Sequence, residues 1–271
     1  MTTASTEPEI PEADVKMTIW EHLAEFRRRL IKSTVAVIVC MIAGWAFRLQ
    51  IFKWLRVPFE NAWAGAHLPG IPEIQTLSAP DIFAGYLEIA LLAGIVGAAP
   101  IVLYQLWAFI SPGLYSREKK YVIPFVFFST SLFATGVCFA HYVVLPFAYS
   151  YFFSLLSQAG DSGTLITSKP TFEYFLDFTT RVHIVCGVVF ELPLFISALS
   201  VARVVTPMQL FKFSRWAILV GFIIGAIVTP GGDVTFQFIV SGAILALYFL
   251  SVGISFVIAP KTKKPDDVKG R

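Results

Sequence analysis

The chain has 271 residues, of which 56% are hydrophobic and only 14% are charged, and its formal net charge is +3. A soluble domain of this length needs more polar side chains to cover its surface, whereas a protein that spans a bilayer has lipid as its solvent. This composition excludes an ordinary soluble fold. It predicts an all-α polytopic membrane protein.

The N-terminal part reads as a tail followed by a surface helix. Residues 1–15 are acidic and contain prolines, so we expect a flexible tail. Thr18 to Glu21 fits a capping box, which marks the start of a helix. Apolar residues then recur at helical spacing through Leu30, which predicts an N-terminal amphipathic helix on the membrane surface, continuous with the first span. With no cleavage motif after Arg27–Arg29 and more apolar runs following, we interpret this first run as an uncleaved anchor.

Six apolar segments predict membrane-spanning helices, because ~20 residues at a rise of ~1.5 Å cross a hydrocarbon core of ~30 Å. They are residues 31–47, 82–110, 121–147, 173–200, 216–228 and 235–256. We expect one six-span domain over 1–271, with spans five and six short. The fifth covers only roughly 20 Å, so either Lys212 and Arg215 extend from a longer helix or the bilayer thins. The cysteines, Cys40, Cys138 and Cys186, form no CxxC pair and are expected to be buried thiols.

The basic residues predict the orientation. An even number of spans places both termini on one side, and most of the 21 Lys and Arg fall on that side. The loops near 48–81 and 148–172 hold few of them. We therefore expect both termini, including the flexible tails 1–15 and 260–271, in the cytoplasm. No transit peptide is visible, so the expected location is the bacterial cytoplasmic (inner) membrane.

Two carboxylates stand at the predicted cytoplasmic edge. Glu25 lies four residues before Arg29, and a helical ion pair is the plain interpretation of this spacing. Glu118 lies in a short basic loop after the helix-breaking pair Pro112-Gly113, where a solvated charge is the plain alternative.

A third carboxylate, Glu191, lies inside the apolar run VVFELPLF (188–195). A charge at the bilayer centre costs ~2.5–3.5 kcal/mol on insertion scales, so this residue is expected to face protein or a water-filled cavity, or to be protonated. Pro193 frees a backbone carbonyl and can bend the helix, which favours a concave face lined by Glu191. A structural hydrogen bond to a neighbouring span is the alternative.

Four blocks of sequence resemble the TatC family, the receptor core of the twin-arginine protein translocase. These blocks are HLAEFRRRL (22–30), APIVLYQLWAFISPGLYSREKK (99–120), VVFELPL (188–194) and TPGGDVTFQ (229–237). The resemblance implies a concave bundle of six helices that binds signal peptides with two consecutive arginines on folded cargo. It also implies single-span partners of the TatA and TatB type, self-association in a multimeric receptor complex and transport driven by the proton-motive force. No cofactor, metal, catalytic residue or nucleic-acid partner is implied.

The resemblance also implies site residues, carried over by position. For signal-peptide binding they are Glu25 and Glu118, flanked by Arg27, Phe109 and Leu114. For the outside cap between spans one and two they are Pro58 and Phe83. For polar contacts with partner helices they are Glu191, Thr229, Asp233 and Gln237. An acidic pair suits an arginine pair, because a guanidinium makes two parallel hydrogen bonds to a carboxylate whereas lysine acts as a point charge.

Some residues depart from the family pattern. Pro230-Gly-Gly-Asp233 stands where the family has Pro-Pro-Asp, and Tyr248-Phe249 stands where it has Tyr-Glu. Four polar residues within the spans have no family counterpart: Glu88, Asp177, Arg181 and His183. Asp177 and Arg181, four apart, predict an ion pair on one helix face.

Two other functions are alternatives for a chain with these residues. A proton-coupled secondary transporter would use Glu191, Asp177 and His183 as a relay, but the sequence contains no inverted repeat. An intramembrane enzyme would need a motif such as HExxH or GxSxG, and neither occurs.

Overall fold

The computed structural model describes residues 19–66, 71–110, 122–160, 169–201, 204–229 and 233–258. Within these ranges the regular structure is helical, apart from one isolated bridge between Gln75 and Thr171. Six helical segments there are long and apolar enough to cross a membrane. The predicted all-α fold with six spans is confirmed, while the tails 1–15 and 260–271 and the predicted cap Thr18 lie outside the described residues.

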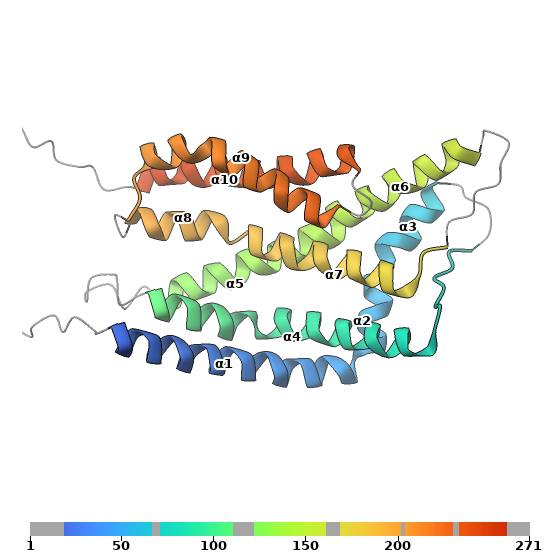
Figure 1. The fold of residues 1–271 in the computed structure, drawn as a ribbon, viewed down its shortest axis with the longest axis horizontal. Helices are drawn as coiled ribbons and strands as arrows, with labels where there is room; N and C mark the ends of the chain where they lie inside the picture. The colour runs from blue at the N-terminus through green and yellow to red at the C-terminus, as the bar shows by residue number, and fades with distance from the viewer. Residues whose placement is uncertain are drawn as a thin grey trace, which may run out of the picture.

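Four of the six spans are single helices and two are broken (Figure 1). The first, second, fifth and sixth spans are α1 (Ile19–Ala46), α4 (Ala79–Ile110), α9 (Pro207–Val228) and α10 (Val234–Ile258). The third consists of α5 (Val122–Phe139), a π-helical turn (Ala140–Val144) and α6 (Leu145–Gly160), and the fourth consists of α7 (Phe172–Val189) and α8 (Leu192–Val201). Two short helices, α2 (Arg48–Leu55) and α3 (Val57–Gly65), follow the first span.

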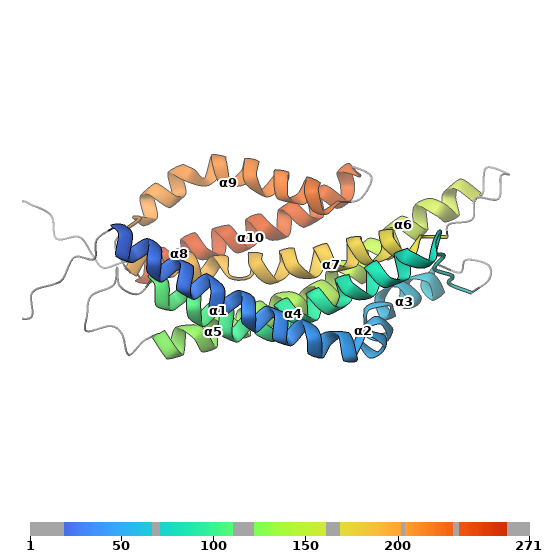
Figure 2. The same cartoon turned by 60° about the horizontal axis from the view of Figure 1, so that its bottom comes forward.

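The long helices lie roughly side by side, and both ends of the helical bundle can be told apart (Figures 1 and 2). The start of α1 and the end of α10 lie at one end, here called the terminal end, and α2 and α3 lie at the opposite, far end. Helix α1 packs along α4, α5 packs on α4 and α7, and α10 packs on α8 and α9. The pair α9–α10 therefore joins the rest of the bundle mainly through α8.

Small residues bring α1 and α4 together. A Cβ atom added to Gly44 would lie 2.6 Å from the Cβ of Ala93, and one added to Gly94 would lie 2.9 Å from the carbonyl oxygen of Val37. Small side chains at such positions let two helix backbones approach closely within a membrane. This contact anchors the N-terminal helix along its length on the second span.

The far end is held by aromatic packing. Phe59 of α3 lies edge-on to Tyr149, Phe153 and Phe175, with ring centroids 5.3–5.6 Å apart. These rings come from the first connection, the third span and the fourth span. The connection after α3 is tied down as well, because the Gln75 amide donates to the Pro170 carbonyl at 3.0 Å and Lys169 pairs with Glu73 at 2.9 Å.

The fifth span starts earlier than its apolar run. Thr206 and Gln209 form a capping box, and α9 runs from Pro207 for 22 residues, so Lys212 and Arg215 lie within the helix. Of the two alternatives for this span, the longer helix is the one found. With 22 and 25 residues, α9 and α10 are nevertheless the shortest of the six spans, as predicted.

The expectation of buried cysteines was wrong. Cys40 and Cys186 are half-buried and Cys138 is exposed. Outward-facing side chains of a spanning helix contact lipid, where a small apolar thiol is stable. An apolar sequence context therefore does not distinguish the core from the lipid-facing side.

Candidate functional site

Glu25 lies on α1 at the terminal end and pairs with Arg29. The Arg29 Nε donates to the Glu25 Oε1 at 2.9 Å, and the Arg29 Nη1 donates to the Oε1 of Gln105 on α4 at 3.4 Å. The predicted helical ion pair is confirmed. The second oxygen, Glu25 Oε2, is buried and has no hydrogen-bond partner among the described residues. This oxygen therefore accepts no hydrogen bond from the described part of the chain.

Phe109 lies beside Glu25, across the contact between α1 and α4. Its ring stacks on His22 with centroids 4.5 Å apart and contacts Phe26 at 5.4 Å. Arg27 is exposed on the same stretch of α1. The structure thus brings Glu25 and Phe109 to one edge of the bundle. The other predicted residues of this site, Leu114 and Glu118, lie outside the described residues.

Glu191 lies at the break between α7 and α8. Its amide donates to the Val188 carbonyl at 3.1 Å, a tighter turn than an α-helix, and its carbonyl accepts from the Phe195 amide at 2.9 Å. Pro193 follows and has no amide hydrogen to continue the α-helical ladder. The ten residues of α8 cover about 15 Å, half of the ~30 Å hydrocarbon core. The carboxylate therefore lies deep within the fourth span.

A chain of hydrogen bonds ties Glu191 to two other spans. The Ser129 hydroxyl on α5 donates to the Glu191 Oε2 at 2.5 Å, and the Trp107 Nε1 on α4 donates to the Ser129 hydroxyl at 3.0 Å. The structural hydrogen bond that was the alternative interpretation of Glu191 is therefore present. The other oxygen, Glu191 Oε1, is buried with no partner in the described part of the chain.

Glu191 also lines a cavity of about 450 Å³, here called the front cavity. Its walls are otherwise almost entirely apolar and include Val37 of α1, Leu103 of α4, Phe133 of α5 and Phe195 of α8. The two predictions for Glu191, a concave face and a structural hydrogen bond to a neighbouring span, are thus both confirmed. This carboxylate is held in place by one oxygen while its side chain faces an apolar hollow between four spans.

The polar face of α7 continues from Glu191 toward the far end. Arg181 Nε donates to Asp177 Oδ1 at 2.6 Å, which confirms the predicted ion pair. The Thr180 hydroxyl makes a short hydrogen bond to Glu88 on α4. Glu88 is therefore accounted for as an interhelical contact between spans two and four.

His183 belongs to a different cluster. Its Nδ1 contacts the Thr179 carbonyl at 2.7 Å, and its ring lies 5.7 Å from that of His141, which stacks on Trp54 at 3.7 Å. No hydrogen bond among the described residues links His183 to Asp177 or Glu191. A relay through these three residues, as the transporter alternative requires, has no hydrogen-bonded path here.

The predicted partner-contact residues between spans five and six bind within the chain. Thr229 is buried and its hydroxyl donates to the Gly225 carbonyl at 2.7 Å. The Gln237 Nε2 donates to the Phe222 carbonyl at 3.0 Å, which ties α10 to α9. Asp233 caps α10 by accepting from the Phe236 amide at 2.8 Å. These bonds fix the α9–α10 corner, and docking of partners there stays a prediction.

The two predicted cap residues lie at the far end but differ in environment. Pro58 is fully buried in the first turn of α3. Phe83 is 61% exposed on the first turns of α4, with its ring 5.5 Å from that of Trp45. Their shared role as an outside cap stays a prediction.

Some features carried little signal in the sequence. The Trp54–His141–His183 cluster joins residues far apart in the chain, and the spacing of these residues fits no motif. The π-helical turn had one signal, since Pro146 just after it cannot donate a backbone hydrogen bond. No group of three or more His, Cys, Asp or Glu in the described ranges has the geometry to hold a metal.

Comparison with known proteins gives a consistent result. A family model described as TatC, Sec-independent protein translocase protein, matches residues 21–260. The TatC protein of Koribacter versatilis is 34% identical over 253 residues, covering 93% of this chain and 90% of the relative. The TatC protein of Aquifex aeolicus is 33% identical, covering 92% and 98%. A crystal structure named twin arginine translocase receptor TatC matches with a TM-score of 0.77 and 33% identity, covering 87% of this chain and 99% of that one.

Proposed function

The chain belongs to the TatC family of Sec-independent protein translocase proteins, and we propose that it is the receptor subunit that binds twin-arginine signal peptides at its terminal end. Membership of this family makes the chain a component of a protein translocase rather than a catalytic enzyme. The solved structure that it resembles carries the word receptor in its name. The observation that carries the proposal is the carboxylate of Glu25, of which one oxygen pairs with Arg29 and the other has no partner among the described residues.

Glu25 is paired with Arg29, and an arginine of the signal peptide can replace Arg29 in this pair. A helical ion pair of this kind contributes only ~0.3–0.5 kcal/mol, so its exchange for a signal arginine costs little. Glu25 Oε2 has no partner among the described residues and offers a second acceptor. A guanidinium can bind both oxygens through two parallel hydrogen bonds, which an ammonium group cannot do. This geometry favours arginine over lysine in the signal.

Apolar contacts are needed as well, since exposed ion pairs contribute only ~0–1 kcal/mol. Phe26, which is 46% exposed, and Phe109 provide aromatic surface directly beside Glu25. The front cavity opens deeper in the bundle and presents apolar side chains around one carboxylate, Glu191. We propose that it accepts the hydrophobic part of a signal peptide or the helix of a partner.

The remaining parts of the proposal concern the assembly. The chain would work in the bacterial inner membrane with both termini in the cytoplasm, as the distribution of Lys and Arg favours. It would associate with single-span proteins of the TatA and TatB type and with further copies of itself, and transport would draw on the proton-motive force. These statements rest on family membership and on the exposed apolar surfaces of the spans.

The test is binding of a fluorescent twin-arginine signal peptide to the purified protein in detergent, with a Lys-Lys version of the peptide alongside. We expect Glu25→Ala and Glu118→Ala each to weaken Arg-Arg binding by up to about fivefold, or ~1 kcal/mol, and to reduce the preference over Lys-Lys. Glu60→Ala is the matched control, because Glu60 forms an equivalent helical pair with Arg56 at the far end. Wild-type binding by the double variant would refute the proposal.

A further inference from the structure

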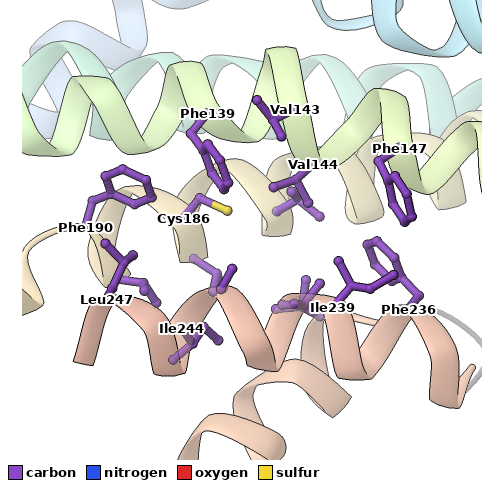
Figure 3. Close-up of a pocket in the computed structure, with 16 residues that line it drawn as sticks. Phe139, Val143, Val144, Phe147, Cys186, Phe190, Phe236, Ile239, Ile244 and Leu247 are labelled. Carbon is purple, nitrogen blue, oxygen red and sulfur yellow. The ribbon is translucent and has the colours of Figure 1, made fainter. Parts of the chain in front are cut away.

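A second hollow lies on the other side of the fourth span, and Figure 3 shows its walls. It has a volume of about 180 Å³ and lies between the π-helical turn with the start of α6, the second half of α7 and the first half of α10. All 16 lining side chains are apolar: they are Phe, Val, Ile, Leu and Ala, with the thiol of Cys186 as the one heteroatom group. We call it the back groove.

The back groove is separate from the front cavity. Val182, Cys186 and Val189 line the groove, whereas Val188 and Glu191 line the cavity. Residues three or four apart share one face of a helix, so these two sets belong to opposite faces of the fourth span. The signal-peptide site proposed above therefore does not include this groove.

Both ends of the groove are closed by aromatic side chains. Toward the far end, Phe236 of α10 is fully buried, with its ring 5.6 Å from Phe152 and 6.1 Å from Phe178. Toward the terminal end, the rings of Phe139 and Phe190 lie 5.3 Å apart. Helix α10 packs on α8 and α9, while α7 packs on α4 and α5. The groove is the gap that this arrangement leaves between spans four and six.

The groove opens toward the surroundings of the bundle. Val143, Phe147 and Ile239 line it and are 50%, 48% and 41% exposed. All three lie within spanning helices, so the medium beyond them is the bilayer hydrocarbon. An acyl chain can enter from that side without crossing a polar layer.

We propose that the back groove seats one acyl chain of a bilayer phospholipid. Water is excluded as the occupant, since apolar cavities of about 150 Å³ stay dry and bind apolar molecules. A partner helix is too large, because a helix with its side chains is ~10 Å across. The walls offer no polar atom to a headgroup or to polar cargo, and an empty groove would lose dispersion contacts on both sides. A narrow, flexible hydrocarbon chain meets all of these conditions.

The bound chain would complete the contact between spans four and six. At the terminal side these spans are joined directly, for example by the hydrogen bond of 2.6 Å between the hydroxyls of Ser200 and Ser255. Along the groove the acyl chain takes the place of such protein contacts. It would stabilise the packing of the α9–α10 pair on the other four spans.

The test uses the full chain reconstituted in vesicles that contain a phosphatidylcholine with a photoreactive diazirine on one acyl chain, followed by mass spectrometry of the labelled peptides. We expect labels to concentrate on the groove walls around Cys186 and Ala243. Ala243→Trp places an indole in the groove and should remove this concentration of label. Ala246→Trp, an exposed position on the same helix, is the matched control and should leave it unchanged.

Wild-type labelling that is even over the lipid-facing residues of all six spans would overturn the proposal without any variant. So would unchanged labelling in a folded Ala243→Trp protein, or crosslinks from these walls to a second protein chain. Folding is checked by the helical circular dichroism signal of each variant, which does not depend on peptide binding. Glu25→Ala should keep the groove labels, so failure of the receptor proposal and failure of the lipid proposal give different results.

Discussion

Replacing Ser129 with Ala tests whether the hydrogen bonds at Glu191 hold spans two, three and four together. The Ser129 hydroxyl donates to Glu191 and accepts from Trp107, so Ser129→Ala breaks both bonds at once. It leaves the indole N–H without an acceptor and the second Glu191 oxygen without a donor. The side chain itself is fully buried, so water does not replace the lost partner.

The size of the effect follows from the number of groups left unpaired. Interhelical hydrogen bonds in membranes contribute ~0.6 kcal/mol on average and at most ~1.7. An unpaired buried polar group costs ~1–3 kcal/mol, more when it is charged. With two bonds lost, we expect the free energy of unfolding to fall by about 2 kcal/mol, which changes the ratio of folded to unfolded protein by up to about 30-fold.

The measurement is reversible unfolding in mixed detergent, followed by circular dichroism. Ser131→Ala is the matched control, because the Ser131 hydroxyl lies on the exposed side of the same helix and donates to the Phe127 carbonyl of its own backbone. That change should stay within ~0.5 kcal/mol. Equal losses for the two variants would refute the inference that this network joins three spans.

Two further predictions concern helix contacts. Gly136→Ala places a Cβ atom 2.5 Å from the carbonyl oxygen of Cys186, so we expect the free energy of unfolding to fall by ~1–3 kcal/mol. Gly242→Ala is the control, because its Cβ atom meets nothing within 4 Å and should leave the unfolding midpoint unchanged. Similar shifts for the two variants would contradict close packing of α5 on α7. Gln237→Leu removes the bond to the Phe222 carbonyl and should cost ~0.6–1.7 kcal/mol in the same assay. Loss of partner capture without this destabilisation would instead indicate that Gln237 acts outward.

The spans could be predicted from the sequence because length and apolarity alone decide whether a segment crosses a bilayer. The fifth span shows where this criterion fails. Its apolar run begins only after Lys212 and Arg215, although the capping box of Thr206 and Gln209 marks the true start of the helix. Long basic side chains lie along apolar surface and reach the interface, so they need not end a span.

Local pairs were predictable and distant pairs were not. Glu25–Arg29 and Asp177–Arg181 followed from spacing, because residues four apart are neighbours on a helix. The bond from Ser129 to Glu191 joins residues 62 positions apart, and no periodicity specifies which helices meet. The position of Glu191 in an apolar run correctly predicted that it has a hydrogen-bond partner. The identity of that partner depends on how the spans pack.

The two faces of the fourth span differ in polarity, and each face therefore favours a different kind of ligand. On one face Glu191 keeps one oxygen without a partner in the described structure, so a ligand with a hydrogen-bond donor gains a contact there that a hydrocarbon chain cannot make. On the opposite face the back groove offers only carbon and a thiol, so a polar ligand would lose its hydration without compensation. Because the two sets of residues lie on different faces of the fourth span, they cannot exchange places unless the helix rotates. A signal or partner helix with a polar side chain is therefore directed to the front cavity, and lipid to the back.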